Sequence, residues 1–210
     1  MKIRKYHTIN INLLNSLRTK TNWYGRLSNL NDPFECFIID NTDTNEYKYL
    51  IKSLCVCCFS KNMDEILMWS HYADSHRGVC LEWEIDDALL GTQLVEMCYE
   101  NQITTLNTVE RTQTGNLSLN IATNGKFIKT KFKNWEYEEE LRTYIICEDR
   151  TNSGKSKPFL GELTTIYFGK NVNNRDIALV KENTQHIANL NYKKVDINID
   201  HMKMNNLTNI

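Results

Sequence analysis

One apolar run constrains the fold more than any other feature of the sequence: Leu54-Cys55-Val56-Cys57-Cys58-Phe59, which shows no alternation with polar residues. A strand with one face in water alternates, whereas a strand covered on both faces does not. The run is far shorter than the roughly 20 apolar residues that cross a bilayer, and no other stretch approaches that length. It therefore predicts a strand buried on both faces.

Composition limits the class of protein further. The 210 residues (24.7 kDa) suit one sizeable domain, and 41% hydrophobic with 24% charged residues indicates a packed core. The 25 basic and 26 acidic residues give a net charge of -1, which excludes nucleic-acid or membrane binding driven by bulk charge. Seven cysteines are an odd number, and the N-terminus has no apolar signal stretch. We therefore expect reduced thiols, a cytoplasmic location and no disulfide framework.

The first half of the chain reads as strands and short helices. Residues 3–9 are expected to form an edge strand, and Asn10 or Asn12 to cap a helix with Leu13, Leu14 and Leu17 on one face. A strand at 23–27 ends in a turn before Pro33. A helix is expected from 64 to about 73, followed by strands at 79–85 and 94–99.

The second half begins with residues 101–125, which are rich in Asn, Thr, Gln and Ser and are expected to form a loop-rich insert. A helical turn should lead into a strand near Glu140. A strand at 164–168, a helix from Asn173 or Asn174 to about 190, and a half-exposed strand through 195–199 follow. Residues 201–210 are expected to be a frayed tail. The pattern predicts a single α+β domain over residues 1–200, with mixed or antiparallel sheets and short helices.

Three clusters carry candidate chemistry, the first of which is Asn31-Asp32-Pro33-Phe34-Glu35. One interpretation is a structural turn, in which the Asn and Asp side chains form hydrogen bonds with their own backbone and Pro fixes φ. The alternative is that Phe34 covers a ligand while a carboxylate of Asp32 or Glu35 binds its hydroxyls. Both interpretations stay open.

The second cluster is Met68-Trp69-Ser70-His71-Tyr72-Ala73, followed by Asp74, His76, Arg77 and Gly78. On a helix, Met68 and Tyr72 share a face, and so do Trp69 and Ala73. A core helix explains Met68 and Trp69. The polar tips of His71 and Tyr72 need a wet or bonded site, and a protonated His gains from the C-terminal end of a helix dipole.

The third cluster is Trp135-Glu136-Tyr137-Glu138-Glu139-Glu140-Leu141-Arg142. If the segment is extended, Glu138, Glu140 and Arg142 point to one side; if helical, Glu138 and Glu139 lie over Arg142. Glu136 and Glu139 are interpreted as solvated charges. Glu138, Glu140 and Arg142 are the candidates for a carboxylate held in place for chemistry.

Two weaker signals carry no prediction of function. Cys55 and Cys58 form a lone C-x-x-C without a second pair at zinc-like spacing, so buried thiols explain them better than metal ligands. Gly169 precedes a helix, as in phosphate-binding turns, but a single glycine is too unspecific a signal to predict such a turn.

In order along the chain, the clusters resemble domain-of-unknown-function family 2971, a bacterial and phage-borne family. The resemblance rests on the first cluster, Cys58-Phe59-Ser60, residues 68–82, residues 135–142 and Ile166-Tyr167-Phe168-Gly169. It spans about residues 6–195. It implies a fold more firmly than an activity.

The opening strand–helix–strand, a central Tyr and a late Glu also resemble ADP-ribosyltransferases such as the DNA-modifying DarT toxins, which cleave the nicotinamide–ribose bond of NAD. That resemblance implies an ADP-ribosyltransferase-like fold with NAD as substrate and no metal. It makes Glu140 or Glu138 the carboxylate beside the ribose and Tyr72 or Trp69 the stacking face. The remaining expected contacts, to ribose, pyrophosphate or ligand hydroxyls, are His71 (also a candidate catalytic group), Arg77, Arg142, Asn31, Asp32 and Glu35.

Three functions are therefore weighed. The first is a NAD-consuming transferase acting on nucleic acid, nucleotide or protein, in conflict between phage and host. The second is a non-catalytic module of a phage or defence system that binds a nucleotide or a protein. The third is a metal-dependent nuclease or hydrolase built on Asp32, Glu35 and Glu138. None of the three involves a membrane.

Overall fold

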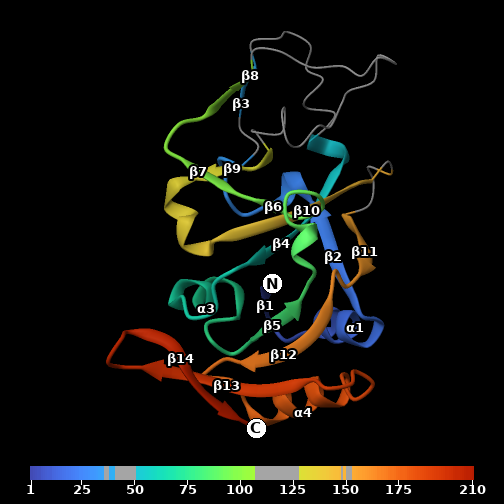
Figure 1. Ribbon diagram of the computed structural model, residues 1–210, viewed down its shortest axis with the longest axis vertical. Coiled ribbons are helices and arrows are strands. Elements are labelled where there is room, and N and C mark those ends of the chain that lie inside the picture. Colours follow the sequence, from blue (N-terminus) through green and yellow to red (C-terminus); the bar gives the residue numbers. More distant parts are fainter. Residues whose placement is uncertain (36–37, 41–50, 107–127, 148, 150–152) are drawn as a thin grey trace.

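The computed structural model describes residues 1–35, 38–40, 51–106, 128–147, 149 and 153–210. In this part of the chain a curled mixed sheet carries short helices (Figure 1). Its ten strands are β1 (Lys2–His7), β2 (Thr21–Arg26), β4 (Leu54–Ser60), β5 (Val79–Glu84), β6 (Val95–Glu96), β10 (Glu140–Ile146), β11 (Gly154–Pro158), β12 (Glu162–Phe168), β13 (Asn191–Asn198) and β14 (Lys203–Asn209). The α+β class expected from the sequence is confirmed.

The sheet order is β11-β2-β4-β1-β5-β12-β13-β14, and β10 and β6 attach through β4. Two small parallel pairs stand apart from it, β3 (Ile38–Asp40) with β8 (Thr104–Leu106) and β7 (Cys98–Glu100) with β9 (Thr130–Phe132). The helices are α1 (Ile11–Thr19), α3 (Ile66–Tyr72), α4 (Asn174–Glu182) and the 3-10 helices η1 (Leu27–Asn29), η2 (Asp87–Leu89) and η4 (Lys133–Glu138). Most of the expected insert, residues 107–125, lies outside the described residues.

The apolar run of the sequence is β4, and its prediction as a buried strand is confirmed. Leu54, Cys55, Val56, Cys57 and Phe59 are all at most 3% exposed. One edge of β4 pairs with the whole of β10, from Ser60 opposite Glu140 to Leu54 opposite Ile146. This register brings the third sequence cluster against the middle of the sheet.

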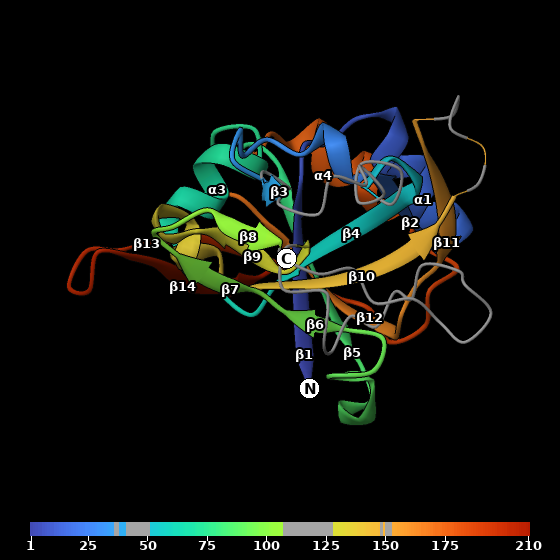
Figure 2. The ribbon, with the colours of Figure 1, turned by 90° about the horizontal axis from the view of Figure 1, so that it is seen from above.

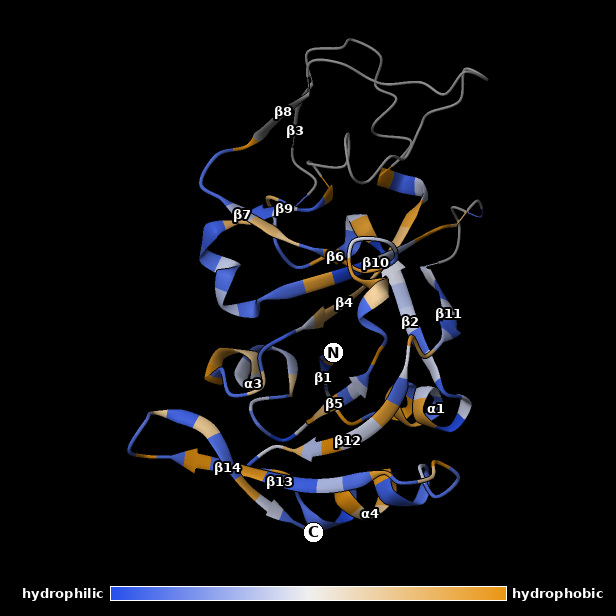
Figure 3. Ribbon diagram, in the orientation of Figure 1, coloured by the Kyte–Doolittle hydropathy of each residue, from blue (hydrophilic) through white to orange (hydrophobic). Residues whose placement is uncertain are grey.

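Helices cover both faces of the sheet, as the two-sided burial requires. On one face, Leu13 and Leu17 of α1 and Val180 of α4 pack into the main core. Asn10 caps α1, since its side chain accepts a hydrogen bond from Leu13 N. On the other face, Trp69 of α3 packs edge-on against Tyr6 of β1. Figure 3 shows the corresponding apolar residues of these elements.

The expectation that β1 is an edge strand is wrong. The strand lies between β4 and β5 and pairs with β5 over its full length. Its charges are accommodated because Lys2 and Arg4 both bind Glu82 of β5, a carboxylate with 1% of its side chain exposed. A carboxylate far along the chain thus neutralises the charges of Lys2 and Arg4.

The C-terminal part differs from the prediction in two places. Helix α4 ends at Glu182 and not near 190, because the side chains of Asn183 and Thr184 bond the carbonyls of Leu179 and Val180. Residues 203–209, expected to fray, form β14 along β13. Met204, 1% exposed, joins the core around Trp69 and so fixes this strand.

The second edge of β4 is shared between two strands that diverge. β1 meets it only where Arg4 lies opposite Ser60, and β2 only where Gly25 and Arg26 lie opposite Val56 and Cys55. Seen from above, β1 runs across β4 and β10 (Figure 2). The sheet therefore opens between β1 and β2, with β4 as the floor of the opening.

Candidate functional site

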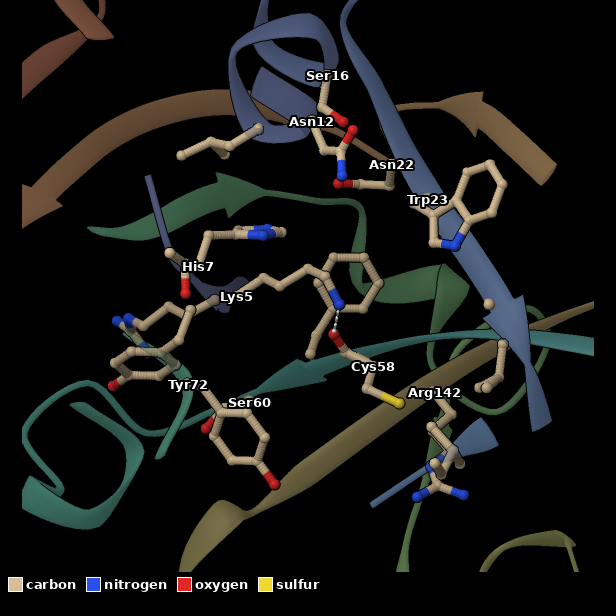
Figure 4. Close-up of a pocket in the computed structure, with 18 of the residues that line it drawn as sticks. Lys5, His7, Asn12, Ser16, Asn22, Trp23, Cys58, Ser60, Tyr72 and Arg142 are labelled. Atoms are coloured by element: carbon tan, nitrogen blue, oxygen red, sulfur yellow. Dashed lines mark hydrogen bonds between the residues drawn. The ribbon is translucent and has the colours of Figure 1, made fainter. Parts of the chain in front are cut away.

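A cavity of about 1060 Å³ occupies this opening. Its walls come from β1, α1, β2, β4, α3, η4 and β10, so segments far apart in the sequence share it (Figure 4). The lining is mixed, and the acidic and basic side chains gather mainly where β10 and η4 meet β4. The three sequence clusters also converge at this end.

Two carboxylates at this end are joined through one lysine. Lys131 of β9 donates to Glu138 Oε2 and, at 2.9 Å, to Glu140 Oε2. All three side chains are at most 4% exposed. Charge-assisted hydrogen bonds of this kind are strong where water is excluded. The lysine thus holds both carboxylates in a fixed arrangement on the cavity wall.

The backbone between the two carboxylates explains why both turn inward. Glu139 adopts φ 43°, in the left-handed region, between the end of η4 and the start of β10. Tyr99 OH accepts a hydrogen bond from Glu140 N at 2.7 Å, and Ser60 Oγ donates to Glu138 O at 2.6 Å. Glu139 itself is exposed, as is Glu136, which pairs with Lys133.

Arg142 holds Glu140 from the other side. Its Nε donates to Glu140 Oε1 at 2.6 Å and its Nη2 to Glu140 Oε2 at 2.9 Å, while Nη1 pairs with Glu35 Oε1. The Arg142 side chain is 0% exposed. Glu35 Oε2 is buried and, among the described residues, has no hydrogen-bond partner. Glu35 is also one of the residues that line the cavity.

Tyr72 and Asn31 extend the network toward α3. Tyr72 OH donates to Glu138 Oε1 at 2.5 Å and accepts from Asn31 Nδ2 at 2.7 Å. Both residues line the cavity. A neutral hydroxyl therefore completes the coordination of Glu138, whereas Glu140 is surrounded by two cations.

The environments separate the acidities of the two carboxyls. Burial would raise the pKa of Glu140, but Arg142 and Lys131 outweigh it and hold the pKa at about 2. For Glu138, burial raises the pKa above its ordinary value, and Lys131 offsets this only in part. Burial also raises the pKa of Glu35. Glu140 stays ionised, whereas Glu138 takes up a proton more readily, a difference typical of sites where two carboxyls have distinct roles.

The structure brings six of the ten predicted site residues to the cavity: Glu138, Glu140, Tyr72, Arg142, Asn31 and Glu35. Asp32 lies behind them, 3% exposed, with its Oδ1 accepting from Phe34 N as in a turn. The turn and the ligand interpretations of this cluster thus fall on different residues. Asp32 shapes the loop, and Asn31 and Glu35 face the cavity.

The other three predicted residues lie elsewhere. Trp69 is 0% exposed and donates from Nε1 to Met63 O at 3.0 Å, so it belongs to the core. His71 is exposed beside the rings of Tyr72 and Tyr137. Arg77 is exposed and pairs with Asp74. None of them lines the described cavity.

Lys131 and Lys5 are the site residues that the sequence analysis missed. Lys131 lies after the loop-rich insert, and its part appears only when β9 is placed beside the end of η4. Lys5 lies on β1 and reaches the cavity floor, where its Nζ donates to Cys58 O at 2.8 Å (Figure 4). The alternation of Lys5 and His7 along β1 was the only available signal.

The cysteines in the described part of the chain belong to no cluster that could hold a metal ion. Cys55 and Cys57 are at most 1% exposed. Among the residues that the structure describes, no three His, Cys, Asp or Glu side chains are placed to hold one metal ion. The hydrolase hypothesis therefore gains no support from this geometry.

The fold and the site define an α+β protein with a cleft of mixed polar and apolar lining between diverging strands. Residues 68–143 match the model of a family described as protein of unknown function, DUF2971. The match begins within α3, includes the glutamates at 138 and 140 and ends within β10, and it supports the resemblance to that family. No curated protein and no solved structure matches the chain. In the described residues, no helix has the length and apolar character to cross a membrane.

Proposed function

We propose that this protein consumes NAD and transfers its ADP-ribose to an acceptor, with Glu138 as the carboxylate next to the reacting carbon. The observation that carries the proposal is the pair of buried carboxylates, bridged by Lys131, on the wall of a large cleft. The likeness to ADP-ribosyltransferases gains no support from the comparisons. The chemistry of the site is therefore the basis of the proposal.

The reaction requires negative charge beside a sugar. The bond between C1′ of the ribose and the nicotinamide nitrogen breaks, and its electron pair leaves with nicotinamide, which becomes neutral. The ribose develops oxocarbenium character, which a nearby carboxylate stabilises. A lone pair of the acceptor then forms the new bond to C1′, and the acceptor's proton passes through the Glu138 carboxylate to solvent.

Glu138 suits this role better than Glu140. Both oxygens of Glu140 are taken by the guanidinium of Arg142, with Lys131 in addition, so its charge is largely neutralised. One oxygen of Glu138 meets only the neutral hydroxyl of Tyr72, which a ribose hydroxyl can replace. Glu140 then acts as a positioning residue, because it fixes the lysine that fixes Glu138.

The test is release of nicotinamide from NAD, followed by proton NMR. Glu138→Gln keeps the shape but removes the charge, and we expect it to slow release by about 10²- to 10³-fold. Glu136→Gln is the matched control: it alters a glutamate of the same 3-10 helix that is 56% exposed, and we expect no change. Undiminished release by a folded Glu138→Gln protein would contradict the proposal.

One observation favours a second function, a non-catalytic module that binds a nucleotide. Each carboxylate oxygen of Glu138 and Glu140 already has a protein partner, so the network is complete without a ligand. Thermal-shift measurements distinguish the two functions, because a ligand that binds only the folded state raises the melting temperature. Stabilisation by NAD without nicotinamide release supports the binding module.

A further inference from the structure

Four cationic side chains line the cleft, and they are not equivalent. Arg4 pairs with Glu82, Lys131 with Glu138 and Glu140, and Arg142 with Glu140 and Glu35. Lys5 differs: within the described part of the chain, no carboxylate lies within ion-pair distance of its Nζ. The fourth cation is thus available to a ligand.

The surroundings of Lys5 keep it charged while leaving one donor unused. Its Nζ donates to Cys58 O, a carbonyl on the open edge of β4, and lies 5.8 Å from the centre of the Phe59 ring. Burial lowers the pKa of Lys5, but the nearby Cys57, Cys58 and Glu140 outweigh this and leave the pKa raised. An ammonium has three donors: the Cys58 carbonyl takes one and the Cys57 side chain a second, which leaves one for a ligand.

Neutral polar side chains surround this end of the cleft. Asn12 and Ser16 of α1 and Asn22 of β2 line the cavity there, and His7 follows Lys5 on the same side of β1 (Figure 4). Burial lowers the pKa of His7 to about 3, so at neutral pH this ring adds hydrogen-bonding capacity without charge. A lysine among neutral donors is a common way to bind phosphate, with the lysine as a point charge.

We propose that the Lys5 end of the cleft is a phosphate subsite, which takes the pyrophosphate of a dinucleotide through Lys5 with Asn12, Ser16 and Asn22 around it. The inference rests on the proposed function and names the part of the substrate that anchors it. Lys5 supplies one positive charge at this end. At the other end, three carboxylates face two cations, Lys131 and Arg142, which leaves an excess of one negative charge.

The two ends match the charges of NAD, whose pyrophosphate is anionic and whose nicotinamide ring is cationic. The spacing is also suitable. Arg4, the neighbour of Lys5, lies opposite Ser60, and Ser60 lies opposite Glu140. Two strand spacings separate these backbones, roughly 10 Å. A ribose with its 5′ phosphate fits between side chains that reach inward from such positions.

Inorganic pyrophosphate and ADP-ribose, titrated by calorimetry into the whole chain, test the subsite without any turnover. Wild type is expected to bind both. Lys5→Met keeps the aliphatic stem and removes the charge, and we expect it to weaken both affinities by about tenfold or more, as for other hydrogen bonds to charged groups. Lys5→Arg restores the charge and should remain within a few-fold of wild type.

Lys203→Met is the control, since Lys203 is a half-exposed lysine of β14 that pairs with Asp64 away from the cleft. It should leave binding unchanged. Reductive methylation of wild type, read by mass spectrometry, is a second measurement that needs no variant: pyrophosphate should protect Lys5 and leave Lys203 reactive. Absence of pyrophosphate binding, equal binding by folded Lys5→Met, or no protection of Lys5 would each overturn the subsite. Binding of pyrophosphate without NAD consumption would keep the subsite and refute the transferase.

Discussion

Two buried charge clusters of this protein differ in their balance of charge and in their place in the fold. Around Glu82 of β5, a single carboxylate meets Lys2 at 2.8 Å, Arg4 at 2.8 Å and Tyr167 OH at 3.2 Å. Around Lys131, three carboxylates meet two cations. The first cluster joins neighbouring strands of the sheet, whereas the second forms a wall of the cavity.

The difference shows what separates a structural ion cluster from a candidate active site. Glu82 has more positive than negative charge around it and does not line the cavity, so it needs nothing further. The Lys131 cluster has an excess of carboxylate, and its residues line the cavity. Among the described residues, a buried oxygen of Glu35 has no hydrogen-bond partner. Buried carboxylates in excess over cations cost folding free energy. A function at this site would explain why the protein keeps them.

We expect the largest effect from a substitution that breaks the second cluster. Arg142→Met leaves Glu35 buried without its cation and Glu140 with Lys131 alone, and removal of one partner from a buried ion pair costs about 3–5 kcal/mol. Urea unfolding measures this loss in the free energy of unfolding. Adding Glu35→Gln should recover part of it, because the orphaned charge is then removed. A single variant as stable as wild type would contradict the cluster.

The corresponding change in the first cluster should cost less stability and no activity. Glu82→Gln removes the carboxylate, but Arg4 keeps its bond to Lys61 O and Lys2 is 53% exposed, so we expect about 2 kcal/mol. Nicotinamide release by the folded variant should match wild type. A selective loss of turnover, with stability unchanged, would reverse the roles assigned to the two clusters.

Acid should affect the second cluster in a defined direction. The pKa of Glu140 falls from its ordinary 4.5 to about 2 in the folded protein, so its contribution to stability is present above 4.5 and is lost as the pH falls toward 2. Glu138 and Glu35 act oppositely, since their pKa values are raised; their contribution is present at low pH and is lost as the pH rises through the raised values. Glu140→Gln should therefore flatten the fall in stability between pH 4.5 and 2, as followed by denaturant midpoints.

We expect the smallest effect from a substitution that tests the role of Tyr72. Tyr72→Phe removes one hydrogen bond to Glu138 and should cost about 1 kcal/mol. The lost donor also favours the protonated carboxyl, so the acid limb of the pH–rate profile should move to higher pH. An unmoved acid limb would show that Glu138 does not govern that limb.

The sequence predicted the parts of this fold that depend on local patterns. The apolar run became β4, Asn10 capped α1, and a helical turn led into the strand at Glu140. The prediction from sequence failed where contacts with residues far along the chain determine the position of a strand. Residues 3–9 were expected to form an edge strand, and the pairing of the charged residues of β1 with Glu82 cannot be inferred from spacing along the chain.

The candidate site shows the same limit. Glu138, Glu140 and Arg142 stood out because an acidic run enters a β-prone segment, and Tyr72 because a polar tip needs a bonded site. Lys131 and Lys5 did not, since a single lysine on a strand is ordinary until a carboxylate pair or an open strand edge is placed beside it. His71 and Trp69 were predicted as site residues but lie away from the cavity, because the spacing of residues along the helix did not show which of its faces reaches the cavity.

The most direct test of the central claim is a crystal structure of the chain with ADP-ribose. We predict that the ligand lies in the cleft between β1 and β2, over β4, with its terminal ribose hydroxyls bonded to Glu138 and its phosphates bonded to Lys5. Density for the ligand on another surface, or a filled cleft with the ribose turned away from Glu138, would contradict it.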